Sequence, residues 1–126
     1  MTETMTIAEY REMRSENKYR NRRAVRDGVE FDSQAEATRY GELKLLVQAG
    51  AISDLRLQPS YELQAAFVDT SGVKHRAIAY IGDFEYIEAG RVVCEDVKGM
   101  RTPVFLLKMK LFKFRYPHID FRLVEV

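Results

Sequence analysis

The stretch YIGDFEYIEAGRVVCEDV, residues 80–97, decides the fold, because it is the clearest β-hairpin in the chain. Apolar and polar residues alternate strongly over residues 80–87 and again over residues 91–97, as they do in strands with one buried face. The short segment Glu88-Ala89-Gly90 between them has the composition of a turn. The pattern therefore predicts two neighbouring antiparallel strands.

An amphipathic helix is expected before this hairpin. Ser33 and Glu36, three residues apart, form a capping-box pattern, and apolar residues follow at helical spacing. Gly50 stands where a C-terminal glycine cap belongs. The spacing predicts a helix over residues 33–49.

Shorter strands are expected between the helix and the central hairpin. Residues 55–63 alternate around Pro59, which predicts an edge strand or a break at the proline. Residues 67–68 and 76–80 are expected to pair as a further hairpin across the turn-like residues 69–72.

A second helix is expected after the central hairpin. Thr102 is a good N-cap, Pro103 is tolerated at the first helical position, and Pro117 ends the helix near Arg115. The apolar residues that run along it are Val104, Leu107, Leu111 and Phe114.

A final strand is expected over residues 119–124, where Ile119, Phe121 and Leu123 alternate. A right-handed crossover through the second helix would place it parallel to residues 91–97. Helix, antiparallel strands, helix and strand together predict an α/β fold with a mixed central β-sheet flanked by helices.

The bulk composition limits the class of protein. A chain of 126 residues suits one compact domain, and Cys94 is its one cysteine, so no intramolecular disulfide can form. No stretch approaches the roughly 18 apolar residues of a membrane span, and the N-terminus does not look like a signal peptide. We expect a cytoplasmic protein without a membrane partner.

Charge is unevenly distributed, although the net charge is only +1. Residues 11–26 contain seven basic and two acidic side chains, and residues 98–119 contain six basic and none acidic. Residues 83–96 contain five carboxylates and one arginine. Basic zones on both sides of an acidic one suit a protein that binds phosphates and a divalent cation, although solvated charged faces would give the same pattern. We expect a basic N-terminal arm over residues 1–26 and one folded domain over residues 27–126.

The candidate chemistry lies at the end of the central hairpin. Alternate side chains of a strand share a face, so Asp96 and Lys98 point the same way, and Asp83 on the paired strand lies beside Asp96. Two carboxylates and the Val97 carbonyl could bind Mg²⁺ or Mn²⁺, and the lysine could orient an attacking water for phosphodiester hydrolysis. The alternative is that Asp96 and Lys98 form a weak ion pair on the surface.

Here the sequence resembles a known group of enzymes. The order Glu36, Asp83, then Asp96-Val97-Lys98 resembles the PD-(D/E)XK nuclease superfamily, in which a helical glutamate precedes the aspartate and the (D/E)-x-K strand. The wider pattern is similar to small phage-encoded nucleases related to Holliday-junction resolvases, over roughly residues 18–117. The matching pieces are Phe31 to Ala37 with Arg39-Tyr40, Leu57-Gln58-Pro59, Asp83-Phe84, Glu95 to Gly99, Arg101-Thr102, and Lys108 with Lys110. Gly82 stands where the superfamily is named for a proline.

The resemblance implies a restriction-endonuclease-like core and an Mg²⁺- or Mn²⁺-dependent endonuclease acting on branched or recombination-intermediate DNA, in a phage or its bacterial host. Asp83 and Asp96 would be metal ligands and Lys98 the water-orienting lysine. Glu36 would be a fourth member of the site, although it can also be read as the capping glutamate of Ser33. A homodimer would suit paired nicks. The rival hypothesis is a non-catalytic DNA-binding module with this fold, against which the intact acidic and basic site residues argue.

Other charged residues divide into DNA contacts and structural partners. Glu95 lies on the opposite face from Asp96, so we expect it to pair with a basic residue. Lys108 and Lys110 cannot share one helix face; we favour Lys108 for the site and Lys110 for the flanking DNA backbone, with a solvated face as the alternative. The further DNA contacts expected are Arg101 and Thr102 at the helix start and Arg20, Arg22 and Arg23 in the arm.

Overall fold

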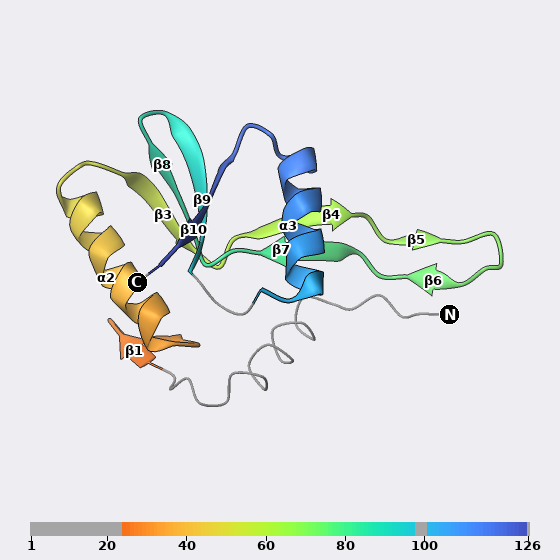
Figure 1. The fold of residues 1–126 in the computed structure, drawn as a ribbon, viewed down its shortest axis with the longest axis horizontal. Helices are drawn as coiled ribbons and strands as arrows, with labels where there is room; N and C mark the ends of the chain where they lie inside the picture. Colours follow the sequence, from red (N-terminus) through yellow and green to blue (C-terminus); the bar gives the residue numbers. More distant parts are fainter. Residues whose placement is uncertain (1–23, 98–100, 126) are drawn as a thin grey trace.

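The computed structural model describes residues 24–97 and 101–125 (Figure 1). The elements are β1 (Ala24–Arg26), β2 (Val29–Phe31), α2 (Gln34–Gln48), β3 (Ser53–Leu57), β4 (Ser60–Gln64), β5 (Phe67–Val68), β6 (Lys74–His75), β7 (Ile78–Ile81), β8 (Phe84–Glu88), β9 (Arg91–Val97), α3 (Pro103–Arg115) and β10 (Asp120–Val124). No helix in these two ranges is long and apolar enough to cross a membrane.

The largest sheet is mixed and has the strand order β10-β9-β8-β3. Strands β8 and β9 form the expected antiparallel hairpin, and β3 pairs antiparallel with the outer side of β8. Strand β10 returns after α3 and lies parallel to β9, with Phe121 opposite Cys94. The expected α/β fold with a mixed sheet and two helices is confirmed.

Helices α2 and α3 cover opposite faces of this sheet, as Figure 1 shows. Val93 and Val97 of β9 pack in one core cluster with Tyr40 and Leu43 of α2. Cys94, which points to the other face of β9, packs in a second cluster with α3 residues. Cys94 is therefore a small, fully buried core residue.

The ends of α2 follow the local signals in the sequence. The Ser33 hydroxyl accepts a hydrogen bond from the Glu36 N–H at 3.2 Å, which caps the helix start. Beyond the last turn, Gly50 has a positive φ of 76°, a conformation that glycine adopts without the steric cost of a side chain. The strand after the helix breaks at Gln58-Pro59 into β3 and β4, so the expected break at the proline is confirmed.

The second predicted hairpin has a different register. Phe67 pairs with His75, and Gln64 pairs with Ile78, so β4–β7 and β5–β6 form one long two-stranded ribbon that projects from the body (Figure 1). The pairing of residues 67–68 with residues 76–80 was wrong. Oδ1 of Asp69 accepts hydrogen bonds from two backbone N–H groups at the tip, which tightens the turn and starts the returning strand earlier.

The last three residues of the predicted N-terminal arm form a strand. Ala24, Val25 and Arg26 were assigned to the N-terminal arm, but they form β1, which pairs with β2. Ala24 is buried in the same cluster as Phe31. This burial ties the three residues to the folded domain; the rest of the arm, including Arg20, Arg22 and Arg23, lies outside the described residues.

Helix α3 has the predicted bounds but turns a different face to the core. Phe105, Lys108 and Phe112 are its buried residues. Three residues of the apolar run that indicated this helix, Leu107, Leu111 and Phe114, are exposed by 58%, 39% and 87%. The helix contains two apolar stripes. The stripe with Phe105 and Phe112 is the buried one, because these two rings pack against Tyr61, Tyr80 and Phe121.

Candidate functional site

Two buried carboxylates lie side by side at the end of the β8–β9 hairpin. Phe84 pairs with Glu95 in this antiparallel ladder, so the preceding Asp83 lies opposite Asp96. The Asp83 N–H donates to the Glu95 carbonyl at 2.9 Å, and its Oδ2 accepts the Val97 N–H at 2.7 Å. Asp83 is 4% exposed and Asp96 is 2% exposed. The predicted adjacency of the two aspartates is confirmed.

Gly82 allows the chain to turn into this position. A Cβ added at Gly82 would lie 2.7 Å from Sγ of Cys94, closer than such atoms pack. The Gly82 N–H donates to the Pro59 carbonyl and the Gln58 N–H donates to the Asp83 carbonyl, both at 3.0 Å. These bonds fix the junction between β7 and β8, where Asp83 begins its approach to Asp96.

The hydroxyl of Tyr80 donates a hydrogen bond to Oδ2 of Asp96. Tyr80 is 2% exposed, and its ring contacts Phe105, Phe112 and Phe121. Burial first, and the nearby Asp96 charge second, raise the pKa of Tyr80 well above its ordinary value. The phenol therefore stays protonated and acts as a fixed donor to the carboxylate. No local signal in the sequence predicts this contact, although a buried tyrosine hydroxyl needs a partner.

Glu36 lies at the start of α2 and points into the same region. It is 7% exposed, and with Asp83 it lines a cavity of about 250 Å³. The other residues that line this cavity are Val29, Glu30, Phe31, Leu57, Gln58 and Phe84. Among the described residues, none forms a hydrogen bond or ion pair with the Glu36 carboxylate. Its backbone thus satisfies the Ser33 cap while its side chain is turned toward the acidic end of the hairpin.

Glu95 faces away from Asp96 and belongs to a buried ion pair. Nε and Nη2 of Arg39 donate to the two Glu95 carboxylate oxygens at 2.8 and 2.6 Å, and the Tyr86 hydroxyl also donates to Glu95. The hydrogen bond that Arg39 donates to Glu95 raises the pKa of Arg39 above its ordinary value. The expectation that Glu95 pairs with a basic residue is confirmed, and its position on the α2 side of β9 separates it from Asp96, which accepts from Tyr80 on the other side.

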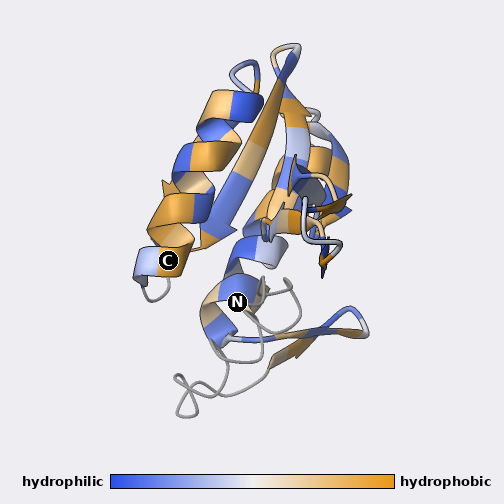
Figure 2. Ribbon diagram, turned by 90° about the vertical axis from the view of Figure 1, so that its right-hand side faces the viewer, coloured by the Kyte–Doolittle hydropathy of each residue, from blue (hydrophilic) through white to orange (hydrophobic). Residues whose placement is uncertain are grey.

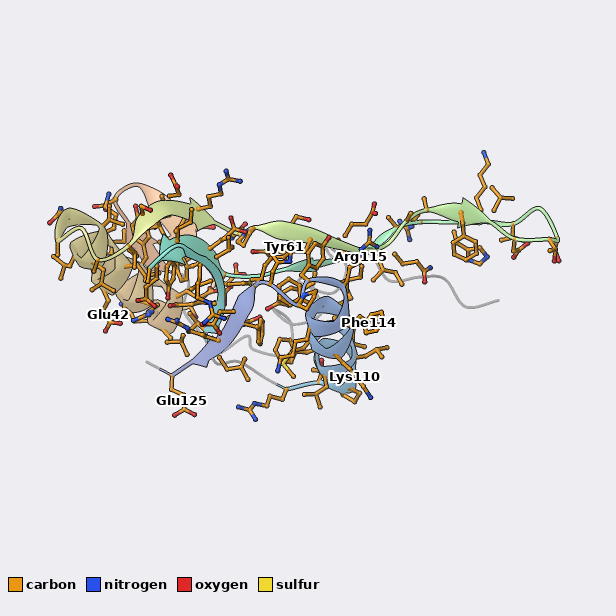
Figure 3. All side chains as sticks on the ribbon, turned by 90° about the horizontal axis from the view of Figure 1, so that it is seen from above. Glu42, Tyr61, Lys110, Phe114, Arg115 and Glu125 are labelled. Atoms are coloured by element: carbon orange, nitrogen blue, oxygen red, sulfur yellow. The ribbon has the colours of Figure 1, made fainter. Side chains whose placement is uncertain are left out.

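Lys108 and Lys110 lie on different faces of α3, as their spacing requires. Lys108 is 4% exposed, and its Nζ donates to the Ala79 carbonyl at 3.1 Å, beside Tyr80. Burial lowers the pKa of Lys108. Lys110 is exposed and points outward from the helix (Figure 3). Lys108 therefore packs under the candidate site, and Lys110 is available to a partner in solution.

The remaining predicted site residues lie near the start of α3. The Thr102 hydroxyl accepts the Phe105 N–H at 3.1 Å, which confirms the predicted N-cap, and Arg101 before it is exposed. Lys98 lies outside the described residues, two positions after Asp96.

The donor set fits a magnesium ion better than a transition metal. Within residues 24–97 and 101–125, no group of three or more histidine, cysteine, aspartate or glutamate side chains is placed to hold a metal. Mg²⁺ usually keeps several waters and takes only one or two protein carboxylates. Asp83 and Asp96, buried side by side, are hard oxygen donors of that kind, and a cation would offset the repulsion between them.

Fold and site together define an α/β protein with a buried carboxylate pair at the end of its central hairpin. The chain belongs to the family described as "Protein of unknown function (DUF1064)", which matches residues 16–125. No curated protein and no solved structure matched the chain.

Proposed function

We propose that this protein is a metal-dependent endodeoxyribonuclease with a restriction-endonuclease-like PD-(D/E)XK core. The observation that supports it most is the register of β8 and β9, which brings Asp83 and Asp96 together as buried neighbours. The order of a helix with Glu36, then the Asp83 strand, then Asp96-Val97-Lys98 is the order of that superfamily. A buried acidic pair is costly to fold without function, because like charges in a poorly solvated site repel.

Asp83 and Asp96 would hold Mg²⁺ or Mn²⁺, with the Val97 carbonyl as a further oxygen ligand. The metal supplies Lewis acidity at the phosphate and lowers the pKa of water. Tyr80 keeps one Asp96 oxygen in place through its hydrogen bond. Glu36, which lines the same cavity as Asp83, would accept hydrogen bonds from water bound to the cation.

Lys98 is two residues after Asp96 and, in an extended strand, shares its face. Its ammonium group would orient the attacking water or stabilise the charge that develops on the phosphate. Lys108 supports the site indirectly: its Nζ donates to the Ala79 carbonyl, which ties α3 to the strand that contains Tyr80.

DNA would be held along its phosphates by basic residues on both sides of the site. Lys110 is exposed on α3, and Arg101 is exposed just before the helix N-terminus, which Thr102 caps and which carries the positive end of the helix dipole. Arg20, Arg22 and Arg23 would follow the duplex from the N-terminal arm. Binding of this kind weakens steeply with salt and shows little sequence preference.

The substrate class we propose is branched DNA formed in recombination or replication, in the cytoplasm of a phage-infected or bacterial cell. The experiment is to incubate the protein with four-way-junction, flap, duplex and single-stranded DNA in the presence of Mg²⁺ or Mn²⁺. Asp96→Ala and Lys98→Ala serve as controls. Cleavage that requires metal and is lost in both variants supports the nuclease, and the DNA that is cut fastest identifies the substrate.

The second candidate is a DNA-binding module that keeps this fold without catalysis. The exposed Lys110 and Arg101 favour it equally. It predicts DNA binding that is unchanged in both variants and no cleavage with either metal, so the same experiment separates the two functions.

A further inference from the structure

A second cavity, which we call the α2–β3 cavity, lies between α2 and the last strand of the four-stranded sheet. Its volume of about 410 Å³ is within the range of ligand pockets. Four of its lining residues share one face of α2 at helical spacing and two alternate along β3: Tyr40, Lys44, Val47, Gln48, Leu55 and Leu57. Apolar side chains therefore line it on both the helix side and the strand side.

Tyr40 gives this cavity a buried polar group. The residue is 7% exposed, and its ring packs near Phe31 and Phe84 with centroids 5.1 and 6.4 Å away. Within the part of the chain that the structure describes, the Tyr40 hydroxyl forms no hydrogen bond, whereas the hydroxyls of Tyr80 and Tyr86 both donate to carboxylates. A buried phenol normally has a partner. A ligand in the α2–β3 cavity could supply one.

The other polar groups suit a neutral, flat ligand better than an anion. Lys44 is the one cation among the lining residues, and its Nζ lies 5.7 Å from the centre of the Tyr40 ring and 3.8 Å from Oδ2 of Asp27, which partly offsets its charge. The Gln48 amide and the Tyr40 hydroxyl can each donate and accept hydrogen bonds. A nucleobase combines apolar faces with a hydrogen-bonding edge, and a glutamine amide can bond two adjacent groups of adenine.

The α2–β3 cavity adjoins the cavity that contains Glu36 and Asp83. Leu57 lines both, and the next residue, Gln58, lines the acidic one. A DNA strand with one phosphate at the acidic cavity could therefore place a neighbouring base on the other side of Leu57.

We propose that the α2–β3 cavity binds one unpaired nucleobase of the DNA substrate, preferably adenine, beside the phosphate that is cut. This inference rests on the proposed nuclease function and narrows its substrate to branched DNA with an unpaired nucleotide next to the cut. Val47 and Leu55 would cover the faces of the base, and Gln48 and Tyr40 would bond its edge. Removing a base from the stack costs least when the base is already unpaired.

The outer side of α3 is the other apolar surface on which a base could stack. Figure 2 shows hydrophobic residues recurring along α3, and Phe114, which is 87% exposed, projects away from the body in Figure 3. A convex helix face would cover only one side of a base, whereas the α2–β3 cavity has apolar walls on two sides. Phe114→Ala is therefore the variant that tests the rival position.

The test is the affinity of the protein for short fluorescent duplexes in EDTA, where no metal-dependent cleavage occurs. One duplex has a single unpaired adenine, and a second has an abasic site at the same position. We expect wild type to bind the adenine duplex at least about tenfold more tightly. Gln48→Ala and Tyr40→Phe should each reduce this preference by about 2–10-fold, as the loss of one hydrogen bond does. Val47→Trp should abolish it by filling the cavity, with an unchanged circular dichroism spectrum.

Leu45→Ala is the matched control, because Leu45 is 65% exposed on α2 and does not line the cavity. Both Leu45→Ala and Phe114→Ala should keep the preference for adenine. Equal binding of the two duplexes by wild type, a preference kept by Val47→Trp, or one lost in Phe114→Ala would overturn the proposal. Because binding is measured without metal, a preference for adenine without cleavage in Mg²⁺ would contradict only the nuclease. Cleavage without the preference would contradict only the base site.

Discussion

Arg39 and Glu95 form a two-point ion pair that joins α2 to the central strand β9, with N–O distances of 2.8 and 2.6 Å. Glu95 is fully buried, and the residue after it is Asp96. The same arginine also donates to Glu42 at 3.0 Å, so it spans from the core to the surface of α2. The pair fixes the helix that contains Glu36 against the strand that contains Asp96.

Removing Arg39 should therefore destabilise the fold strongly. Arg39→Ala leaves the Glu95 carboxylate buried without its cation, and losses of this kind cost about 3–5 kcal/mol. Urea unfolding followed by circular dichroism measures the change. Arg56→Ala is the control, because Arg56 is 74% exposed and lies 4.0 Å from Glu85, and exposed pairs contribute about 0–1 kcal/mol. Equal losses in the two variants would contradict the structural role of the buried pair.

Tyr80 should position Asp96 for metal binding. Tyr80→Phe removes the hydroxyl that donates to Oδ2 of Asp96, and losing such a supporting contact weakens metal sites by about 10–100-fold. Mn²⁺ affinity measured by titration calorimetry gives the effect. Tyr61→Phe is the matched control, since that buried hydroxyl donates to Glu85 at 2.6 Å. If wild type binds Mn²⁺ and the two variants bind it equally well, Tyr80 has no positioning role.

The Glu36 carboxylate should lower the stability of the metal-free fold and strengthen the binding of metal. Its carboxylate is 7% exposed without a partner among the described residues, so Glu36→Gln should leave the metal-free fold unchanged or stabilise it by about 1 kcal/mol. The same change should reduce the rise in melting temperature that Mg²⁺ produces. Glu42→Gln, on the exposed side of α2, should leave the metal response intact. A glutamine variant that melts earlier and responds fully to Mg²⁺ would show that the Glu36 carboxylate stabilises the fold and takes no part in metal binding.

The buried thiol of Cys94 should make the free energy of unfolding fall at high pH. Burial raises the pKa of Cys94 from 9.0 to about 12, so the folded thiol stays neutral where the unfolded thiol ionises. Its contribution to stability is complete below pH 9 and is lost as the pH rises toward 12. The stability difference between wild type and Cys94→Ala should therefore shrink by roughly 1 kcal/mol per pH unit above 9 in urea unfolding. A constant difference up to pH 11 would mean that the thiol is solvated.

Local signals in the sequence predicted most of the elements. Ser33 and Gly50 mark the ends of α2, Thr102 and Pro103 start α3, and the turn after Glu88 sets the register that pairs Asp83 with Asp96. Each of these features depends on a few neighbouring residues. The hairpin register is then sufficient to bring the two aspartates together.

Features that depend on contacts between residues far apart in the sequence could not be predicted from such local signals. The sequence indicated that Glu95 needs a cation but not that Arg39, 56 residues earlier, supplies it. The Tyr80 contact to Asp96 depends on how β7 crosses the end of β9. Helix α3 offers two apolar stripes at helical spacing, and only the aromatic neighbours on the sheet decide that Phe105 and Phe112 are the buried ones.

The most direct test of the proposed function is the rate of cleavage of a fluorescent four-way junction as Mg²⁺ is raised from zero, for wild type and Asp96→Ala at equal concentration. We predict no cleavage without metal, a rate that rises and saturates with Mg²⁺ for wild type, and a loss of at least about a thousandfold in the variant. Cleavage by Asp96→Ala at the wild-type rate, or none by wild type on any of the four DNA forms, would contradict the assignment.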